Sequence, residues 1–137
     1  MAEKFINIEL ATPSHKENIG QAKSCSAPGV MGRFQVLPNH SSMVSELGVG
    51  EVKIDLPDKT QYYAVSGGFL EVLNNRLLLL LETAEEAQSI DISRAERSRD
   101  RARQRLQNRK EKIDVHRAET ALARALNRLR IAEKVRH

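Results

Sequence analysis

The residues that break helices divide this chain sharply near residue 84. All seven glycines and all four prolines occur at or before Gly68, and no aromatic residue follows Phe69. Glycine and proline mark turns and interrupt helices, so the first part is typical of strands and tight turns and the last part of uninterrupted helix. We therefore expect two domains, at residues 1–84 and 85–137.

The balance of charge changes at the same boundary. Up to Thr83 the chain has 7 basic and 9 acidic residues, a net charge of −2, whereas from Ala84 onward it has 15 and 9, a net charge of +6. Such a basic half predicts an anionic partner, which could be phosphate, nucleic acid, a membrane surface or an acidic protein face.

Several classes of protein are disfavoured. Cys25 is the single cysteine and no Cys/His cluster has metal-ligand spacing, so we expect neither a disulfide framework nor a metal site. The apolar run Leu77–Leu81 is too short to span a membrane, and the first residues lack the apolar stretch of a signal peptide. We expect a soluble protein of a reducing compartment. No phosphate loop or catalytic constellation is present, so we do not expect an enzyme.

The first part carries the periodicity of short strands. Alternating or apolar runs predict strands at 5–10, 52–56, 62–65, 69–73 and 76–81. Asn74-Asn75 suits a two-residue hairpin turn, because asparagine tolerates positive φ, and Gly67-Gly68 indicates a bulge or a close backbone approach. This pattern favours an antiparallel sandwich or barrel.

The second part repeats itself with a displacement of 23 residues. Ile90–Glu96 (IDISRAE) returns as Ile113–Glu119 (IDVHRAE), and Asp91 and Asp114 are the expected N-caps of two helices joined near 108–112. The second helix has one apolar stripe, formed by Val115, Ala118, Leu122, Ala125, Leu129 and Ala132. The first helix offers only Ala95, Ala102 and Leu106, with Ser98. We expect a weak helical hairpin that the β-domain or a partner must hold.

Arginines recur at fixed steps in both helices. Arg94, Arg101 and Arg105 have the spacing i, i+7, i+11, which is repeated by Arg117, Arg124 and Arg128. Each trio lies in a narrow strip at the edge of the apolar stripe. Two interpretations stay open: an anion clasp of guanidinium groups, or a solvated basic face balanced by acids such as Glu96 and Glu119.

Three segments give the chain a resemblance to a known family. Ser26–His40 (SAPGVMGRFQVLPNH), Ala64–Val72 (AVSGGFLEV) and Thr83–Ala87 (TAEEA) resemble the signature segments of the epsilon subunit of F-type ATP synthases, and the resemblance covers nearly the whole chain. It implies a β-sandwich of about ten strands followed by a two-helix hairpin.

The resemblance also implies a role and partners. The chain would be a non-catalytic subunit of the central rotor stalk, peripheral to the cytoplasmic face of the bacterial plasma membrane. Its sandwich would bind the gamma subunit and the ring of c subunits. Its hairpin would either fold or extend along gamma toward the catalytic α/β head, where it would restrain ATP hydrolysis by docking on the acidic lever of the β subunit. No cofactor is required.

The resemblance extends to members of the family that bind ATP as a regulatory ligand. Ile90–Ala95 (IDISRA) matches their nucleotide motif. Their contact residues correspond here to Glu85, Asp91, Arg94, Ala95, Arg101, Arg117, Arg124 and Arg128. Arg105 lies outside this set.

The loop that faces the c-ring in the family departs from the usual pattern. Arg33 stands where Glu or Gln is usual, and Gln35 and Asn39 stand where Gly is usual. Asn39 can adopt a left-handed turn and Gln35 less easily. The implied ring contacts are Arg33 and His40. The alternative is a basic module, unrelated to ATP synthase, that binds nucleic acid or an acidic protein. The basic half has no aromatic residue for base stacking, so we do not expect nucleic acid.

Overall fold

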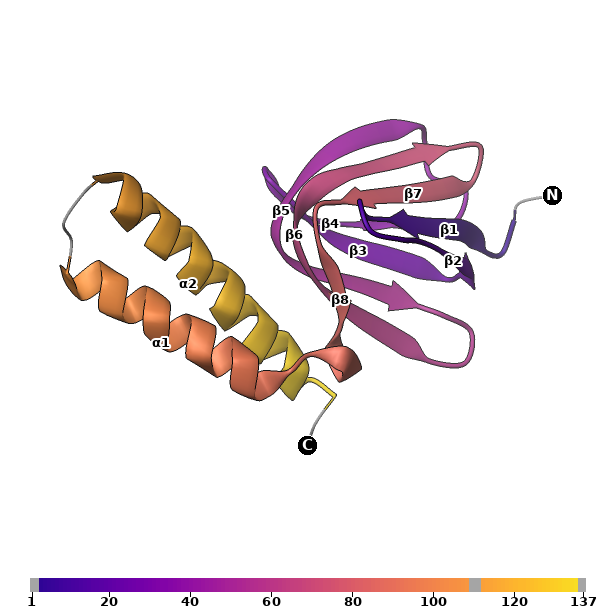
Figure 1. The fold of residues 1–137 in the computed structure, drawn as a ribbon. Helices are drawn as coiled ribbons and strands as arrows, with labels where there is room; N and C mark the ends of the chain where they lie inside the picture. The colour runs from indigo at the N-terminus through magenta and orange to yellow at the C-terminus, as the bar shows by residue number, and fades with distance from the viewer. Residues whose placement is uncertain (1–2, 109–111, 136–137) are drawn as a thin grey trace. The chain divides into compact units, whose positions relative to one another are not determined.

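The computed structural model describes residues 3–108 and 112–135, with the side chains of 112–114 excepted. The chain divides into two compact units, Met1–Glu86 and Ala87–His137 (Figure 1). The first unit, here called the β unit, consists of strands. The second, here called the hairpin, consists of helices. Among the described helices, none combines the length and the apolar composition needed to cross a membrane.

The β unit is a sandwich built from one continuous sheet. Its described strands are β1 (Ile6–Ala11), β2 (Lys16–Ala22), β3 (Ser24–Gly29), β4 (Gly32–Val36), β5 (Met43–Asp55), β6 (Thr60–Leu73), β7 (Arg76–Leu81) and β8 (Ala84–Glu86). The sheet order is β2-β1-β7-β6-β5-β3-β4, and β8 pairs with β6. β1 and β7 run parallel, and the other neighbours run antiparallel.

The β unit has eight described strands rather than about ten because β5 and β6 each pass through both layers. They pair from Met43↔Val72 to Asp55↔Thr60. One end of β6 pairs with β7 and the other with β8, so each of these strands contributes to two layers while counting once.

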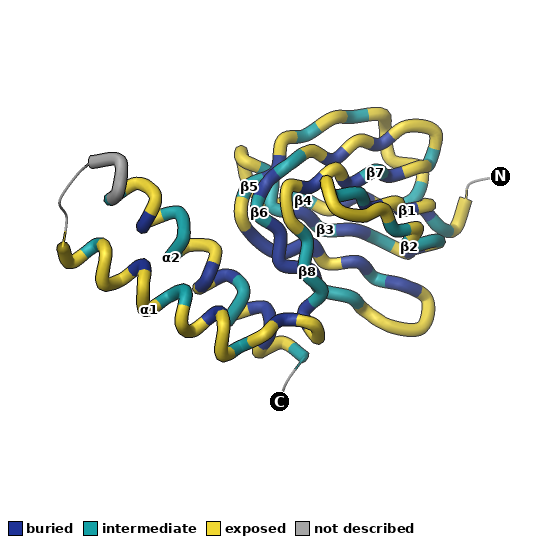
Figure 2. The backbone as a smooth tube through the Cα atoms, in the orientation of Figure 1, coloured by how far each residue is buried: buried dark blue, intermediate teal, exposed yellow. Residues whose placement is uncertain are grey.

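The core of the sandwich follows the two-residue period of the strands. In β1 and β7 every second side chain is buried, as Ile6, Ile8 and Leu10 and as Leu77, Leu79 and Leu81. Cys25 lies in the same core, where burial raises the pKa of its thiol to about 12. The strands predicted at 5–10 and 76–81 are thus confirmed (Figure 2). The strands predicted separately at 62–65 and 69–73 are parts of one strand, β6, and the strand predicted at 52–56 is the end of the longer β5.

The turn residues behave as their chemistry predicts. Asn74 and Asn75 have φ of 50° and 59° and form the two-residue turn between β6 and β7. Asn39 also adopts positive φ, 67°. Gly68 has φ of 139°, and a Cβ on it would overlap the carbonyl oxygen of Leu80, which confirms the close backbone approach.

The hairpin contains a short 3₁₀ turn, η1 (Ala87–Ser89), and two α-helices, α1 (Ile92–Asn108) and α2 (Lys112–Glu133). Asp91 caps α1 as predicted, since its Oδ1 accepts a hydrogen bond from the backbone N–H of Arg94 at 3.0 Å. The predicted N-cap Asp114 is wrong: the helix that it would cap begins at Val115, whereas α2 begins three residues earlier, at Lys112. Nothing in Lys112 or Ile113 breaks a helix, so α2 begins at Lys112 and Asp114 falls in its first turn.

The seam of the hairpin is made of alanine. The buried residues of α1 are Ala95 and Ala102, and α2 buries Ala118, Ala125 and Ala132 at the same seven-residue spacing. Toward its end α2 also buries Asn127 and Ile131. The larger members of the predicted stripe, Leu122 and Leu129 among them, are only half-buried. Each alanine removes only one methyl group from water, so the seam gains less than the ~1.5–3 kcal/mol that a buried leucine would give. The small size of these alanines is consistent with the predicted weakness of the hairpin, which remains a prediction.

Candidate functional site

Seven of the eight predicted nucleotide contacts lie in the hairpin. Asp91 precedes α1, which carries Arg94, Ala95 and Arg101, and α2 carries the remaining three arginines, Arg117, Arg124 and Arg128. All are exposed except Ala95, which is buried in the seam, and Arg128, which is half-buried. Glu85 belongs to the β unit, where it lies on β8 opposite Ala64 of β6.

Helix geometry places the predicted arginines on one face of the hairpin. Starting from the buried Ala95 and turning about 100° per residue, the arginines of α1 lie about 80–120° to one side of the seam. The arginines of α2 lie at the same angles, in the same sense, from the buried Ala118. Because the helices are antiparallel, the same sense of rotation leads to the same broad face of the pair. This arginine face comprises Arg94, Arg101, Arg105, Arg117, Arg124 and Arg128.

The described acidic residues of both helices lie on the opposite face, here called the acidic face, which also carries Arg103. By the same angles Glu96, Asp100, Glu119 and Glu133 turn about 60–140° to the other side of the seam. Arg99 lies among them, and its guanidinium is 3.9 Å from the Glu96 carboxylate and 3.0 Å from that of Asp100. The hairpin is therefore electrically polarised across its thickness.

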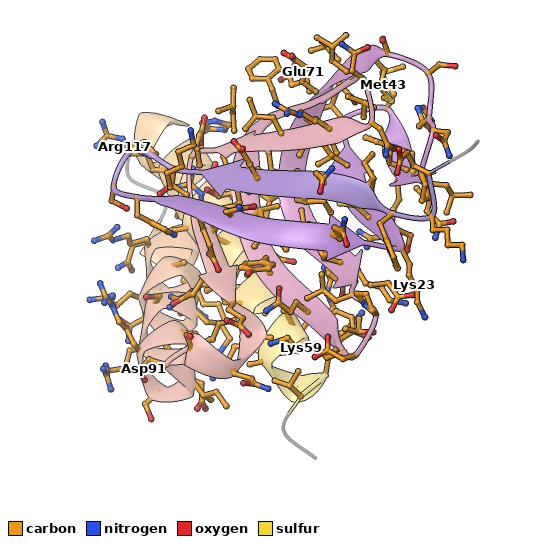
Figure 3. All side chains as sticks on the ribbon, turned by 90° about the vertical axis from the view of Figure 1, so that its right-hand side faces the viewer. Lys23, Met43, Lys59, Glu71, Asp91 and Arg117 are labelled. Atoms are coloured by element: carbon orange, nitrogen blue, oxygen red, sulfur yellow. The ribbon has the colours of Figure 1, made fainter. Side chains whose placement is uncertain are left out.

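Several arginines of the arginine face have no described carboxylate beside them. Arg101 donates a hydrogen bond to the hydroxyl of Ser98 at 3.2 Å, and no described carboxylate forms an ion pair with Arg94, Arg105 or Arg124. Figure 3 shows Asp91 and Arg117 along the same side of the hairpin, one toward each end. Exposed cations that are held close together repel one another and favour a bound anion.

The two helices interleave their arginines. α1 ends at Asn108 and α2 begins at Lys112, so residues equally far from this link lie opposite each other. Ala102 is then opposite Ala118, and Ala95 opposite Ala125, which agrees with the burial of all four. Guanidinium groups from both sides can therefore reach one ligand. Their planar donor pairs match the oxygens of phosphate or carboxylate.

The sequence analysis did not predict that acids and arginines lie on opposite faces, although the spacing of Glu96 and Glu119 indicates it. The same 100° rule that groups the arginines also moves Glu96 and Glu119 away from them, so these acids do not neutralise the arginine face. Arg97 was also missed. It lies one turn beyond Arg94 on the outer edge of the arginine face and is exposed.

The two predicted ring contacts lie in the β unit. Arg33, on β4, reaches across β3 to Glu51 of β5, donating to its carboxylate at 3.1 Å and to its backbone carbonyl at 2.6 Å. His40 is exposed in the loop between β4 and β5, with Nδ1 2.8 Å from the carbonyl oxygen of Ser41. Between β3 and β4 the turn presents Met31, which is 97% exposed.

Both units of the chain match models of one protein family, over residues 5–133. Residues 5–87 match the β-sandwich domain of the ATP synthase delta/epsilon chain, and residues 88–133 match its long α-helix domain. The chain belongs to the ATP synthase delta/epsilon chain family. The resemblance seen in the signature segments is thereby confirmed, and the chain is a non-catalytic subunit.

Individual relatives support this assignment over nearly the full length. The ATP synthase epsilon chain of Nitratidesulfovibrio vulgaris is 44% identical, covering 94% of this chain and 96% of the relative. That of Syntrophobacter fumaroxidans is 41% identical, covering 98% and 99%. A chain in the structure of the Euglena gracilis mitochondrial ATP synthase (OSCP/F1/c-ring) has the same fold, with a TM-score of 0.84, 19% identity, and coverage of 100% of this chain and 84% of that one.

Proposed function

We propose that this chain is the central-stalk epsilon subunit of a bacterial proton-translocating ATP synthase, peripheral to the cytoplasmic face of the plasma membrane. The observation that carries the proposal is the match of both units, in order, to the two domains of one family. Residues 1–84 attach the chain to the rotor, and residues 85–137 regulate ATP hydrolysis. The attachment partners are the gamma subunit and the c-ring, with Arg33 and His40 near the ring. The contact of Arg33 with Glu51 would hold its guanidinium in a fixed place there.

The regulatory element is the hairpin, which restrains ATP hydrolysis when it extends toward the acidic lever of the β subunit. An alanine seam supports this role, because it gives the folded hairpin little stability to lose. A helix pair with a wholly basic face can exchange its own partner helix for an acidic protein surface.

ATP acts as the ligand that keeps the hairpin folded. Its phosphates lie among Arg94, Arg101, Arg117, Arg124 and Arg128, and Glu85, Asp91 and Ala95 complete the pocket. Packing the helices brings these cations together at an electrostatic cost, and a bound triphosphate removes that cost. It therefore stabilises the folded hairpin more than the extended one.

Reconstitution with the α, β and gamma subunits tests the proposal. The chain should copurify with the complex and lower its rate of ATP hydrolysis, and raising ATP should relieve the restraint. A chain that fails to copurify would leave the alternative, a separate basic binding module.

A further inference from the structure

The arginine face holds two equivalent groups of arginines rather than one continuous row. With Ala102 opposite Ala118, a rise of 1.5 Å per residue gives each arginine a height along the hairpin. Arg101, Arg105 and Arg117 lie within about 6 Å of one another in height, near the link between the helices. Arg94, Arg124 and Arg128 lie within the same span, near the start of α1. The centres of the two groups are about 13 Å apart.

The 23-residue repeat is the reason for this equivalence. In an antiparallel pair, a displacement that carries Arg94 to Arg117 also carries Arg101 to Arg124 and Arg105 to Arg128. The two helices are then related by an approximate two-fold axis through the face. Each group takes one arginine from the start of one helix and two from the body of the other. The second group therefore repeats the backbone placement of the first, although Arg105 is exposed where its counterpart Arg128 is half-buried.

We propose that Arg101, Arg105 and Arg117 form a second phosphoryl-group site, equivalent to the site of Arg94, Arg124 and Arg128. This rests on the proposed function, since the first site is where the triphosphate of ATP would begin. The second site shares Arg101 and Arg117 with the nucleotide pocket, and Arg105 belongs to it alone. Arg105 lies outside the nucleotide contact set, and its role is to complete the second site.

Charge and contacts favour this reading over a solvated face. Among the described residues the second group has no carboxylate beside it, because Glu96, Asp100 and Glu119 turn to the opposite face. Arg105 and Arg117 are exposed and make no described ion pair. Asp114, the counterpart of Asp91 in the repeat, lies outside the described side chains. Three clustered guanidinium groups can surround a tetrahedral oxyanion with paired donors.

Two sources could fill the second site: a separate phosphate-type ion, or the far end of a linear polyphosphate. Both offer the same phosphoryl oxygens. A single polyphosphate that fills both sites must cover the about 13 Å between the centres of the two groups, whereas separate ions need not, so chain length separates the two sources.

Calorimetric titration of the intact chain with pyrophosphate tests the proposal. The wild type should bind two equivalents, and Arg105→Gln should bind one or bind the second at least about tenfold more weakly. Arg103→Gln, on the acidic face, is the matched control and should keep both. A single equivalent in the wild type, or equal losses in the two variants, would overturn the second site.

The affinity for a linear hexaphosphate then distinguishes the two sources. If it binds more tightly than tripolyphosphate in the wild type but not in Arg105→Gln, one chain spans both sites. If length has no effect while two pyrophosphates bind, the second occupant is a separate ion. ATP affinity is measured alongside and should change by less than about twofold in Arg105→Gln. Absent ATP binding with intact pyrophosphate binding would reject the nucleotide proposal and leave this one standing.

Discussion

Asn75 ties three segments of the sandwich together with one side chain. Its amide nitrogen donates to the carbonyl of Phe5 at 2.7 Å, and its amide oxygen accepts from the backbone N–H of Asn39 at 2.9 Å. Asn39 in turn donates from its side chain to the carbonyl of Glu3 at 2.8 Å. An asparagine with positive φ thus serves both as a turn residue and as a link between the chain start, the β4–β5 loop and the β6–β7 turn.

Substituting Asn75→Gly separates these two roles. Glycine accepts the φ of 59°, so the turn survives, but both side-chain hydrogen bonds are lost. We expect the free energy of unfolding to fall by about 1–3 kcal/mol, measured by urea denaturation. Asn74→Gly is the control, because Asn74 has φ of 50° and no described side-chain hydrogen bond. Its free energy of unfolding should fall by much less. Equal losses would show that only the backbone conformation matters.

The charge of Arg124 is expected to contribute directly to nucleotide affinity. Arg124→Gln removes one guanidinium from the arginine face and keeps a long polar side chain. Losing a charge-assisted hydrogen bond costs about 1.5–3 kcal/mol, so ATP should bind roughly ten- to a hundred-fold more weakly in calorimetric titration. Arg103→Gln, equally exposed but on the acidic face, should retain the wild-type affinity. If the two variants bind ATP alike, the arginine face is only a basic surface.

Residue spacing was enough to predict the arginine face but not its surroundings. The i, i+7, i+11 steps identified the six arginines, and helix geometry places them together. Contacts that depend on the folded sheet could not be predicted. Arg33 and Glu51 are 18 residues apart and meet across β3, which no local pattern reveals. Their meeting depends on the order of strands, and that order is set by long-range pairing.

At the scale of elements, periodicity predicted strands only where one face is consistently apolar. β1 and β7 alternate or are uniformly apolar and were predicted, whereas β2 (KENIGQA) and β3 (SCSAPG) are built from small and polar residues. β3 buries Cys25 and Ala27, which are too small to give an apolar signal. The helix caps show the same limit. Asp91 was predicted correctly as an N-cap, as its hydrogen bond to Arg94 shows, whereas α2 begins before Asp114 because Lys112 and Ile113 are compatible with a helix.

The alanine seam makes the hairpin sensitive to side-chain size. Ala118→Leu inserts a large side chain at a fully buried position of the seam, and overpacking of this kind costs about 1–3 kcal/mol. The arginines are unchanged, yet the two sides of the clasp separate, so ATP affinity should fall by about tenfold in calorimetric titration. Ala123→Leu, exposed on the same helix, is the control and should have no effect. Unchanged affinity in Ala118→Leu would mean that the arginines do not need a packed hairpin.

At the scale of the whole molecule, the core of the sandwich is complete without the helices. Every residue of that core lies between Ile6 and Leu81, and the strand pairing ends with β8 at Glu86. The two units therefore differ in how much they bury: the sandwich has a large apolar core, whereas the buried residues of the hairpin are mostly alanines, with Ile90 and Ile131 as the larger exceptions. A fragment of residues 1–86 should unfold cooperatively by itself, with retained β-sheet circular dichroism. A fragment without a thermal transition would show that the sandwich needs the hairpin.

Removing the hairpin tests the proposed division of function in the assembled complex. A chain ending at Glu86 keeps the sandwich proposed to bind gamma and loses the arginine face, so it should copurify with α, β and gamma at the wild-type ratio. ATP hydrolysis by that complex should be faster than with the full chain at low ATP, because nothing extends toward the catalytic head. As ATP rises the two rates should converge, since ATP favours the folded hairpin in the full chain. In a complex with the Ala118→Leu variant, ATP hydrolysis should stay restrained up to higher ATP concentrations than with the wild type. The variant binds ATP more weakly, while its basic helices can still extend. A truncated complex that hydrolyses ATP no faster than the intact one, at any ATP concentration, would reduce the hairpin to a passive appendage.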